Sequence, residues 1–292
     1  MNKAKYQILN TLWLKVIVII TMTLDHIGAF LEKYFLNINE ALVTTGDAFR
    51  IVGRIAFPLV ALLFAEAMKH THDQEHYLSR LGLFTVIILA VEIGVYYGTN
   101  FELIDGNIFL TLLCSGLFIY FYEKKDYRRL LMIIPLAIII LSFTTDILKY
   151  NAFYPSYLKA QFSLYGFILC VGFYFIYSLV DKRVLALTHQ QKDLQELRQY
   201  GYYRSLTNLL WGALLFLTTV FFWLISFIND TANMYNISLQ SYAMLAVIPI
   251  LLYSGEKGYN NKIVQYSFYV YYPIHILIIF LSFYLILGVP LP

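Results

Sequence analysis

The chain consists of long apolar runs separated by short polar segments. Nine of these runs have about the length of a membrane-spanning helix. A helix needs about 20 apolar residues to cross the hydrocarbon core, within a range of about 17–25. The pattern therefore predicts an all-α polytopic bundle of about nine spans, of which the fourth and eighth are short. The runs are residues 12–31, 48–68, 78–98, 106–122, 129–147, 157–180, 205–228, 239–254 and 263–289.

The composition agrees with this class of protein. Of the 292 residues, 60% are hydrophobic and 13% are charged, whereas a soluble domain is nearer to a quarter charged. We expect a single integral membrane domain over residues 1–292, surrounded by membrane lipid. The longest polar stretch, residues 181–204, is expected to be a cytoplasmic loop whose apolar positions favour an amphipathic surface helix. Nothing indicates a nucleic-acid partner, and the oligomeric state is left open.

The lysines and arginines of the connecting segments predict the orientation. One set of segments holds fifteen of them, while the opposite set holds only Lys33, Lys149 and Lys159. Cytoplasmic loops carry the excess of positive charge. We therefore predict a multi-pass cell-membrane protein with a cytoplasmic N-terminus.

Several polar or ionisable residues lie inside the predicted spans. A charge at the bilayer centre costs about 2.5–3.5 kcal/mol even on mild insertion scales, so such residues usually have a use. At about 1.5 Å of rise per residue, the predicted orientation places most of them in one layer of the outer half, with His275 slightly deeper. We predict that they enclose one polar cavity that opens outward. The residues are Asp25, His26, Arg50, Arg54, Glu92, Asn107 and His275.

Neighbouring residues of a helix point about 100° apart, so Asp25 and His26 are not expected to form a dyad. Asp25 is expected to face Arg54, which would neutralise both charges. His26 is expected to find its partner on another helix. The pair could be purely structural and both His26 and His275 could be packing residues, but histidine suits acid–base chemistry near neutral pH. Pro58 is expected to kink or weaken the helix next to Arg54.

The two cysteines, Cys114 and Cys170, lie within apolar runs and are expected to be buried packing residues. His70, His72 and His76 lie close together, but they lack the fixed ligand spacing of a zinc site. We predict a solvated loop there and no metal site.

Four stretches resemble the TraX family of bacterial membrane proteins. They are LKVIVIITMTLDHIGAF, FRIVGRIAFPLVALLFAEAMKHT, NIFLTLLCSGLFIYFYEKK and SFYVYYPIHILII. The named member of that family is linked to N-terminal acetylation of the conjugative F pilin, in the bacterial inner membrane. The family is distantly similar to transmembrane acyltransferases, which move an acyl group from cytoplasmic acyl-CoA to an acceptor outside. Its members tend to have an acidic residue where this chain has Phe162 and Ser163.

The resemblance implies an acetyltransferase that uses acetyl-CoA as co-substrate and a pilin-like protein, a peptide or a glycan as acceptor. It implies that His26 is the catalytic residue, that Arg54 contacts the thioester or a phosphate, and that His275 belongs to the cavity.

We further expect Asp25 to support His26, and Arg54 or Asn107 to polarise the thioester carbonyl. Asn107, Glu92, His275 and Arg50 are the expected binding residues. A transporter or proton-coupled carrier remains an alternative, because intramembrane charges also mark ion paths. A non-enzymatic partner of a secretion or conjugation apparatus is a third interpretation.

Overall fold

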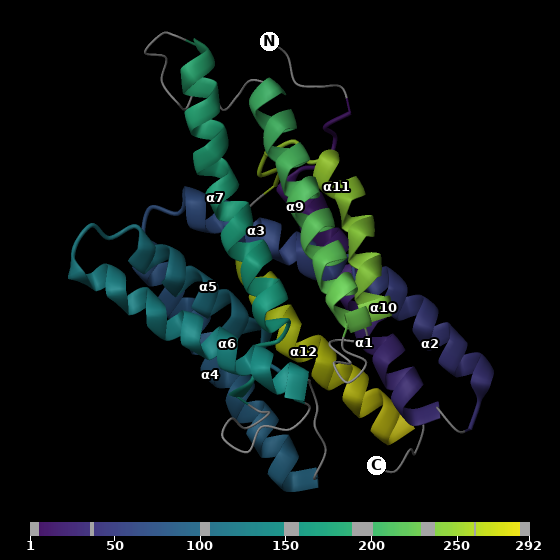
Figure 1. Ribbon diagram of the computed structural model, residues 1–292. Coiled ribbons are helices and arrows are strands. Elements are labelled where there is room, and N and C mark those ends of the chain that lie inside the picture. Colours follow the sequence, from purple (N-terminus) through teal and green to yellow (C-terminus); the bar gives the residue numbers. More distant parts are fainter. Residues whose placement is uncertain are drawn as a thin grey trace.

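The computed structural model describes residues 6–35, 38–99, 106–148, 158–188, 201–228, 237–259 and 261–286. Within these ranges the chain is a bundle of helices without a β-sheet (Figure 1). The all-α class predicted from the apolar pattern is confirmed. In chain order the elements are α1 (Thr11–Phe35), α2 (Glu40–Gly53), α3 (Ala56–His70), α4 (Gln74–Thr99), α5 (Ile108–Tyr122), η1 (Tyr127–Met132), α6 (Ile133–Leu148), α7 (Ser163–Thr188), α9 (Gly201–Ile228), α10 (Ile237–Gln240), η3 (Ser241–Ala246), α11 (Val247–Leu251) and α12 (Lys262–Ile286).

Each of the nine apolar runs corresponds to a helix or to a succession of adjoining helices. Among the described residues, six helical segments are long and apolar enough to cross a membrane, and three apolar helices are shorter. Two of the shorter ones, Ile108–Tyr122 and Ser241–Leu251, are the fourth and eighth runs. The chain is therefore a multi-pass membrane protein, and its described helices allow between six and nine complete crossings.

The predicted polar loop at residues 181–204 is only partly described. Its first residues continue α7 as far as Thr188, and α9 begins at Gly201. The positions between them, half of the expected loop, lie outside the described residues.

The second apolar run is divided into α2 and α3 by a turn at Arg54 and Ile55. Pro58 explains the position of this break, because proline has no N–H to donate to the carbonyl four residues earlier, which belongs to Arg54. The backbone N–H of Ile55 instead bonds the carbonyl of Val52, at 3.3 Å. The weakening of the helix expected beside Arg54 is thus confirmed, and the arginine lies at the interrupted point.

The centre of the bundle is formed by α3, α5 and α7, while α1 joins them to α2 and α12. Figure 1 shows α7 running through the middle, with α9 on one side and α4 to α6 on the other. The buried indole of Trp211 on α9 donates a hydrogen bond to the carbonyl of Phe173 on α7, at 2.9 Å. Cys114 and Cys170 are buried free thiols, as expected.

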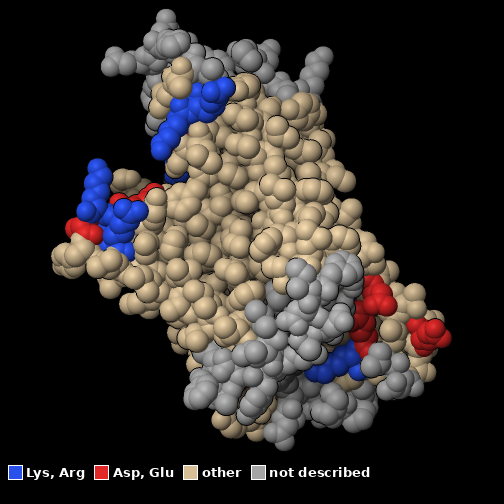
Figure 2. Space-filling model, in the orientation of Figure 1, with Lys and Arg blue, Asp and Glu red and all other residues tan. Residues whose placement is uncertain are grey.

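Much of the outer surface is apolar. Figure 2 shows one face that is uncharged across its middle, with the described charged side chains gathered towards its ends. An uncharged band between two charged ends is what a lipid bilayer requires of a spanning protein. Large exposed apolar side chains on the long helices include Val86, Leu217, Phe221 and Leu224.

A buried ion pair closes one end of the bundle. Arg204 of α9 donates to Glu66 of α3 at 2.9 Å, and His70 lies 3.2 Å from the other carboxylate oxygen. The Glu66 side chain is only 11% exposed. The rings of Trp211 and Tyr253 also lie against the Arg204 guanidinium. This cluster therefore ties α3, α9 and the segment after α11 together.

The orientation stays a prediction that accessibility labelling can test. A cysteine introduced at Asn39 should react with a membrane-impermeant maleimide in intact cells, and one at Lys125 only after permeabilisation. Both positions are exposed, and the native Cys114 and Cys170 are 1% and 0% exposed, so background labelling should be low. The opposite labelling pattern would reverse the orientation and contradict a cavity that opens outward.

Candidate functional site

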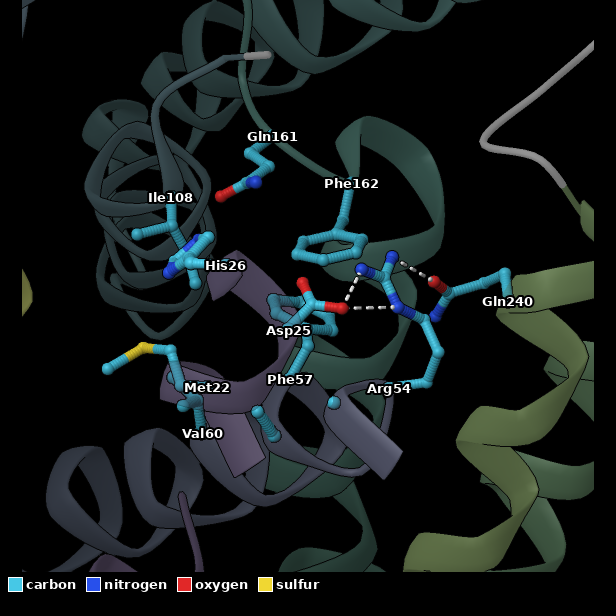
Figure 3. A pocket seen from close by; sticks show the side chains of 12 residues that line it. Met22, Asp25, His26, Arg54, Phe57, Val60, Ile108, Gln161, Phe162 and Gln240 are labelled. Atoms are coloured by element: carbon cyan, nitrogen blue, oxygen red, sulfur yellow. Dashed lines mark hydrogen bonds and ion pairs between the residues drawn. The ribbon is translucent and has the colours of Figure 1, made fainter. Parts of the chain in front are cut away.

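A pocket lies where α1, the turn between α2 and α3, the start of α5, the segment before α7 and α10 meet. Figure 3 shows its side chains, with the Asp25–Arg54 pair on one side and His26 on the other. Asp25, His26 and Arg54, which the sequence placed in one layer, all line it. The lining residues are Met22, Asp25, His26, Gly53, Arg54, Ala56, Phe57, Val60, Ile108, Gln161, Phe162 and Gln240.

Asp25 and Arg54 form the predicted ion pair. The Nε of Arg54 donates to Oδ1 of Asp25 at 3.1 Å, and its Nη2 donates to the same oxygen. The Arg54 side chain is 11% exposed and the Asp25 side chain is 18% exposed. Nη1 of Arg54 points to the amide oxygen of Gln240 at 3.5 Å. The arginine therefore joins α1, the turn after α2 and α10 at the wall of the pocket.

The ion pair depends on a close approach of α1 and α2. A methyl group on Gly53 would overlap the Cα and Cβ atoms of Asp25. One to two turns away, Gly28 and Gly46 lie backbone against backbone in the same way. Glycine at such positions lets two helix backbones approach where any side chain would separate them. Here that approach allows the short Asp25 side chain to reach Arg54.

His26 finds its partner on another helix, as the sequence predicted. Its Nδ1 lies 2.7 Å from Nε2 of His275 on α12. Nδ1 of His275 in turn lies 2.9 Å from the carbonyl oxygen of Tyr271, one turn earlier. The rings of Tyr271 and His275 stack with their centroids 4.8 Å apart and an interplanar angle of 2°. His275 thus contacts His26 and is held by its own helix, but it does not itself line the pocket to which it was expected to belong.

The spacing of the two histidines identifies a hydrogen bond. Zinc binds imidazole nitrogen at about 2.0–2.1 Å and prefers tetrahedral geometry, which separates two ligand nitrogens by well over 3 Å. The observed 2.7 Å between Nδ1 and Nε2 is too short for that arrangement. Within the described ranges, no group of three or more histidine, cysteine or acidic residues is placed to hold a metal ion.

Asn107 has a structural role at the start of α5. Its side-chain oxygen caps the helix by accepting from the N–H groups of Phe109 and Leu110, and its amide nitrogen donates to the carbonyl of Thr85. Both polar atoms of its amide therefore form hydrogen bonds with the backbone, and Asn107 does not line the pocket. The expectation that it polarises a thioester has no support in this geometry. Ile108, the next residue, lines the pocket instead.

The segment before α7 is fixed to the start of α5. The N–H of Asn107 bonds the carbonyl of Lys159 at 2.8 Å, and the N–H of Gln161 bonds the carbonyl of Asn107 at 3.3 Å. Phe162 and Ser163 follow with φ angles of 60° and 25°. Such values are costly for residues with side chains, and they persist only where the surroundings impose them. The result is a rigid support that carries Gln161 and Phe162 into the pocket.

Arg50 and Glu92 do not line the pocket, although both were expected to bind a substrate or cofactor. Arg50 forms an ion pair with Glu32 of α1, one turn from Arg54 towards the start of α2. Glu92 is 6% exposed within α4. Membrane depth was predicted for both residues, but the direction in which each side chain points around its helix was not.

Among the lining residues that were not candidates from the sequence, Gln161, Phe162 and Gln240 come from segments far along the chain from Asp25, His26 and Arg54. Gln240 could have been noticed as an amide at the start of the eighth apolar run. The places of Gln161 and Phe162 depend on the pairing of this segment with α5 and on the positive φ angles of Phe162 and Ser163, which the sequence did not predict. The ring of Phe162 stacks on Phe57 with the centroids 4.1 Å apart, so it forms a wall of the pocket.

The fold and the pocket define a multi-pass helical membrane protein with an interior ion pair and a histidine pair. The chain belongs to the TraX family, since the family described as TraX protein matches residues 11–189, more than half of its length. The match includes Asp25, His26, Arg54 and Phe162 but ends before Gln240 and His275. No curated protein and no solved structure matches the chain.

Asp25 and Arg54 should be energetically coupled. Removing one partner leaves the other charge buried and uncompensated, which costs about 3–5 kcal/mol. Asp25→Leu or Arg54→Leu alone should therefore lower the thermal unfolding midpoint in detergent. The double variant should recover part of the loss. If the stability loss of the double variant equals the sum of the two single losses, the contact contributes no coupling.

Gly53→Ala should destabilise the protein through overpacking, by about 1–3 kcal/mol. Gly82→Ala in α4 is the matched control, because no atom lies within 4 Å of a methyl group added there. Replacing a helical glycine with alanine in open space should be neutral or stabilise by about 0.5–1 kcal/mol. Equal unfolding midpoints for the two variants would contradict the close approach at Gly53.

Proposed function

We propose that this protein is a membrane acyltransferase that moves an acetyl group from cytoplasmic acetyl-CoA to an amine or hydroxyl acceptor. The observation that carries the proposal is the pocket in which His26 faces a buried Asp25–Arg54 pair. Membership of a family associated with pilin acetylation supports it. A pilin-like protein, a peptide or a glycan at the outer face is the proposed acceptor class.

His26 is the proposed general base. Acyl transfer to an amine requires a group that removes the acceptor proton and later returns it to the leaving group. Imidazole does both near neutral pH. In this step the acceptor nitrogen attacks the thioester carbonyl carbon while its proton passes to His26. The carbon–sulfur bond then breaks, and the proton passes from His26 to the thiolate of coenzyme A, which leaves as the thiol.

Arg54 and Gln161 are the proposed donors to the carbonyl oxygen that becomes negative during attack. Donors that are already oriented are the most effective stabilisers of such an oxyanion. Arg54 is oriented by Asp25 and Gln240, and Gln161 by the segment bonded to α5. In Figure 3 the Gln161 side chain points to the space beside His26. This assigns to Gln161 the polarising role expected of Asn107.

The walls around His26 fit a short acyl chain. Met22, Val60 and Ile108 gather on the side of His26 away from Arg54 (Figure 3). The stacked Phe57 and Phe162 rings lie across the pocket. An acyl methyl group would meet apolar side chains there, while the carbonyl faces the polar donors. This division supports acetyl over longer chains.

The test is transfer from radiolabelled acetyl-CoA in proteoliposomes, with a short peptide bearing a free N-terminus as the acceptor probe. His26→Ala should reduce the rate about 10²–10⁴-fold, as expected when a general base is lost. His70→Ala is the matched control, since His70 lies in the Glu66 cluster and does not line the pocket. It should retain the parent rate.

Activity of His26→Ala within a few-fold of the parent, at equal amounts of folded protein, would assign His26 to packing. Absence of acetyl transfer by the parent, combined with flux of protons or solutes in the same proteoliposomes, would favour the carrier interpretation. Absence of both would favour a non-enzymatic partner of an assembly apparatus.

A further inference from the structure

We propose that His275 is a positioning residue that fixes the tautomer of His26, so that Nε2 of His26 is the nitrogen that accepts the proton. The catalytic consequence rests on the proposed function, but the proton arrangement does not. The inference follows from a chain of contacts that runs from the Tyr271 carbonyl through His275 to His26.

The first link determines where His275 carries its proton. A backbone carbonyl can only accept hydrogen bonds. Nδ1 of His275 lies 2.9 Å from the carbonyl oxygen of Tyr271, so this nitrogen must be the N–H donor. His275 is 4% exposed, and a second proton would add a buried charge beside the Asp25–Arg54 pair, which is already neutral. The ring is therefore neutral, and its Nε2 carries a lone pair.

The second link, between the two histidines, determines which nitrogen of His26 carries its proton. A hydrogen bond of 2.7 Å joins Nε2 of His275 to Nδ1 of His26. Because Nε2 of His275 accepts, Nδ1 of His26 must donate. A neutral imidazole carries one N–H, so the lone pair of His26 is on Nε2. The same logic operates wherever a second group holds a catalytic histidine in its productive tautomer.

Further contacts of α12 with α1 hold the two histidines in place. The Tyr271 hydroxyl forms a hydrogen bond with Thr23 of α1, one turn before His26. The Tyr271 ring stacks on His275 with an interplanar angle of 2°. The two helices are thus joined by two contacts one turn apart. A proton accepted at Nε2 would give an imidazolium whose Nδ1–H already has its acceptor, so little reorganisation would be needed.

The direct test is the ¹⁵N NMR spectrum of the full-length protein in detergent with labelled histidine, in which the ring shifts report which nitrogen carries hydrogen. His26→Gln and His275→Gln assign the signals. In the parent, His26 and His275 should both be protonated at Nδ1. In His275→Leu, His26 should shift towards the Nε2–H form. His275→Gln places an amide oxygen near the former position of Nε2, so His26 should keep its Nδ1–H form.

The rate test uses the same variants with acetyl-CoA and the peptide probe. His275→Leu should lower kcat roughly 10²–10⁴-fold with little change in KM, because a wrong tautomer removes the base without removing binding. His275→Gln should give an intermediate rate. His70→Gln is the matched control for a histidine-to-glutamine change and should leave both the rate and the His26 signals unchanged.

Either of two results would overturn the inference: an Nε2–H form of His26 in the parent, or a His275→Leu variant with the parent's tautomer and kcat. The parent spectrum decides the first point even if His275→Leu does not fold. If the spectra agree but the parent transfers no acetyl group, the proton arrangement stands and the proposed function fails. The two failures are therefore distinguishable.

Discussion

The buried Asp25–Arg54 ion pair is the constraint on which the arrangement of the pocket depends. A charge of either sign in this layer needs its counter-charge within hydrogen-bonding distance, because lipid and apolar side chains offer no alternative. The glycine at position 53 removes the side chain that would hold α1 and α2 apart. Pro58 interrupts the helix at Arg54 itself. Sequence features within a few residues of Arg54 therefore all favour the one contact that neutralises it.

The ion pair also decides what His26 can do. Asp25 is paired with Arg54 through Oδ1, while Nδ1 of the adjacent His26 forms its contact on another helix. The partner of this nitrogen is Nε2 of His275 on α12. The division places the neutral ion pair on one side of the pocket and His26, in contact with His275, on the other. The proposed general base and the proposed polarising cation can then lie in one pocket without neutralising each other.

The sequence predicted several features from length, charge, proline and the 100° step of a helix, but for other residues it did not predict the direction of the side chain. The apolar runs, the interrupted helix at Arg54, the Asp25 contact and the partner of His26 on another helix were all predicted. Asn107 has the predicted depth, but its amide caps α5 and contacts Thr85. Arg50 turns to Glu32. Gln161 is placed by its backbone pairing with Asn107, and Phe162 has a positive φ angle that its residue type does not predict.

The Asp25–Arg54 and Glu66–Arg204 ion pairs differ in a way that indicates which one is suited to chemistry. Arg204 and Glu66 are enclosed by the rings of Trp211 and Tyr253, and Gly255 lies so close that a side chain there would overlap the guanidinium. Neighbouring groups therefore occupy the space around this ion pair, as expected for a pair with a structural role. Arg54 and Asp25 instead border a pocket that also contains a histidine. A charged pair that borders a pocket supports the proposed substrate site, whereas the filled surroundings of Arg204 and Glu66 support a structural role.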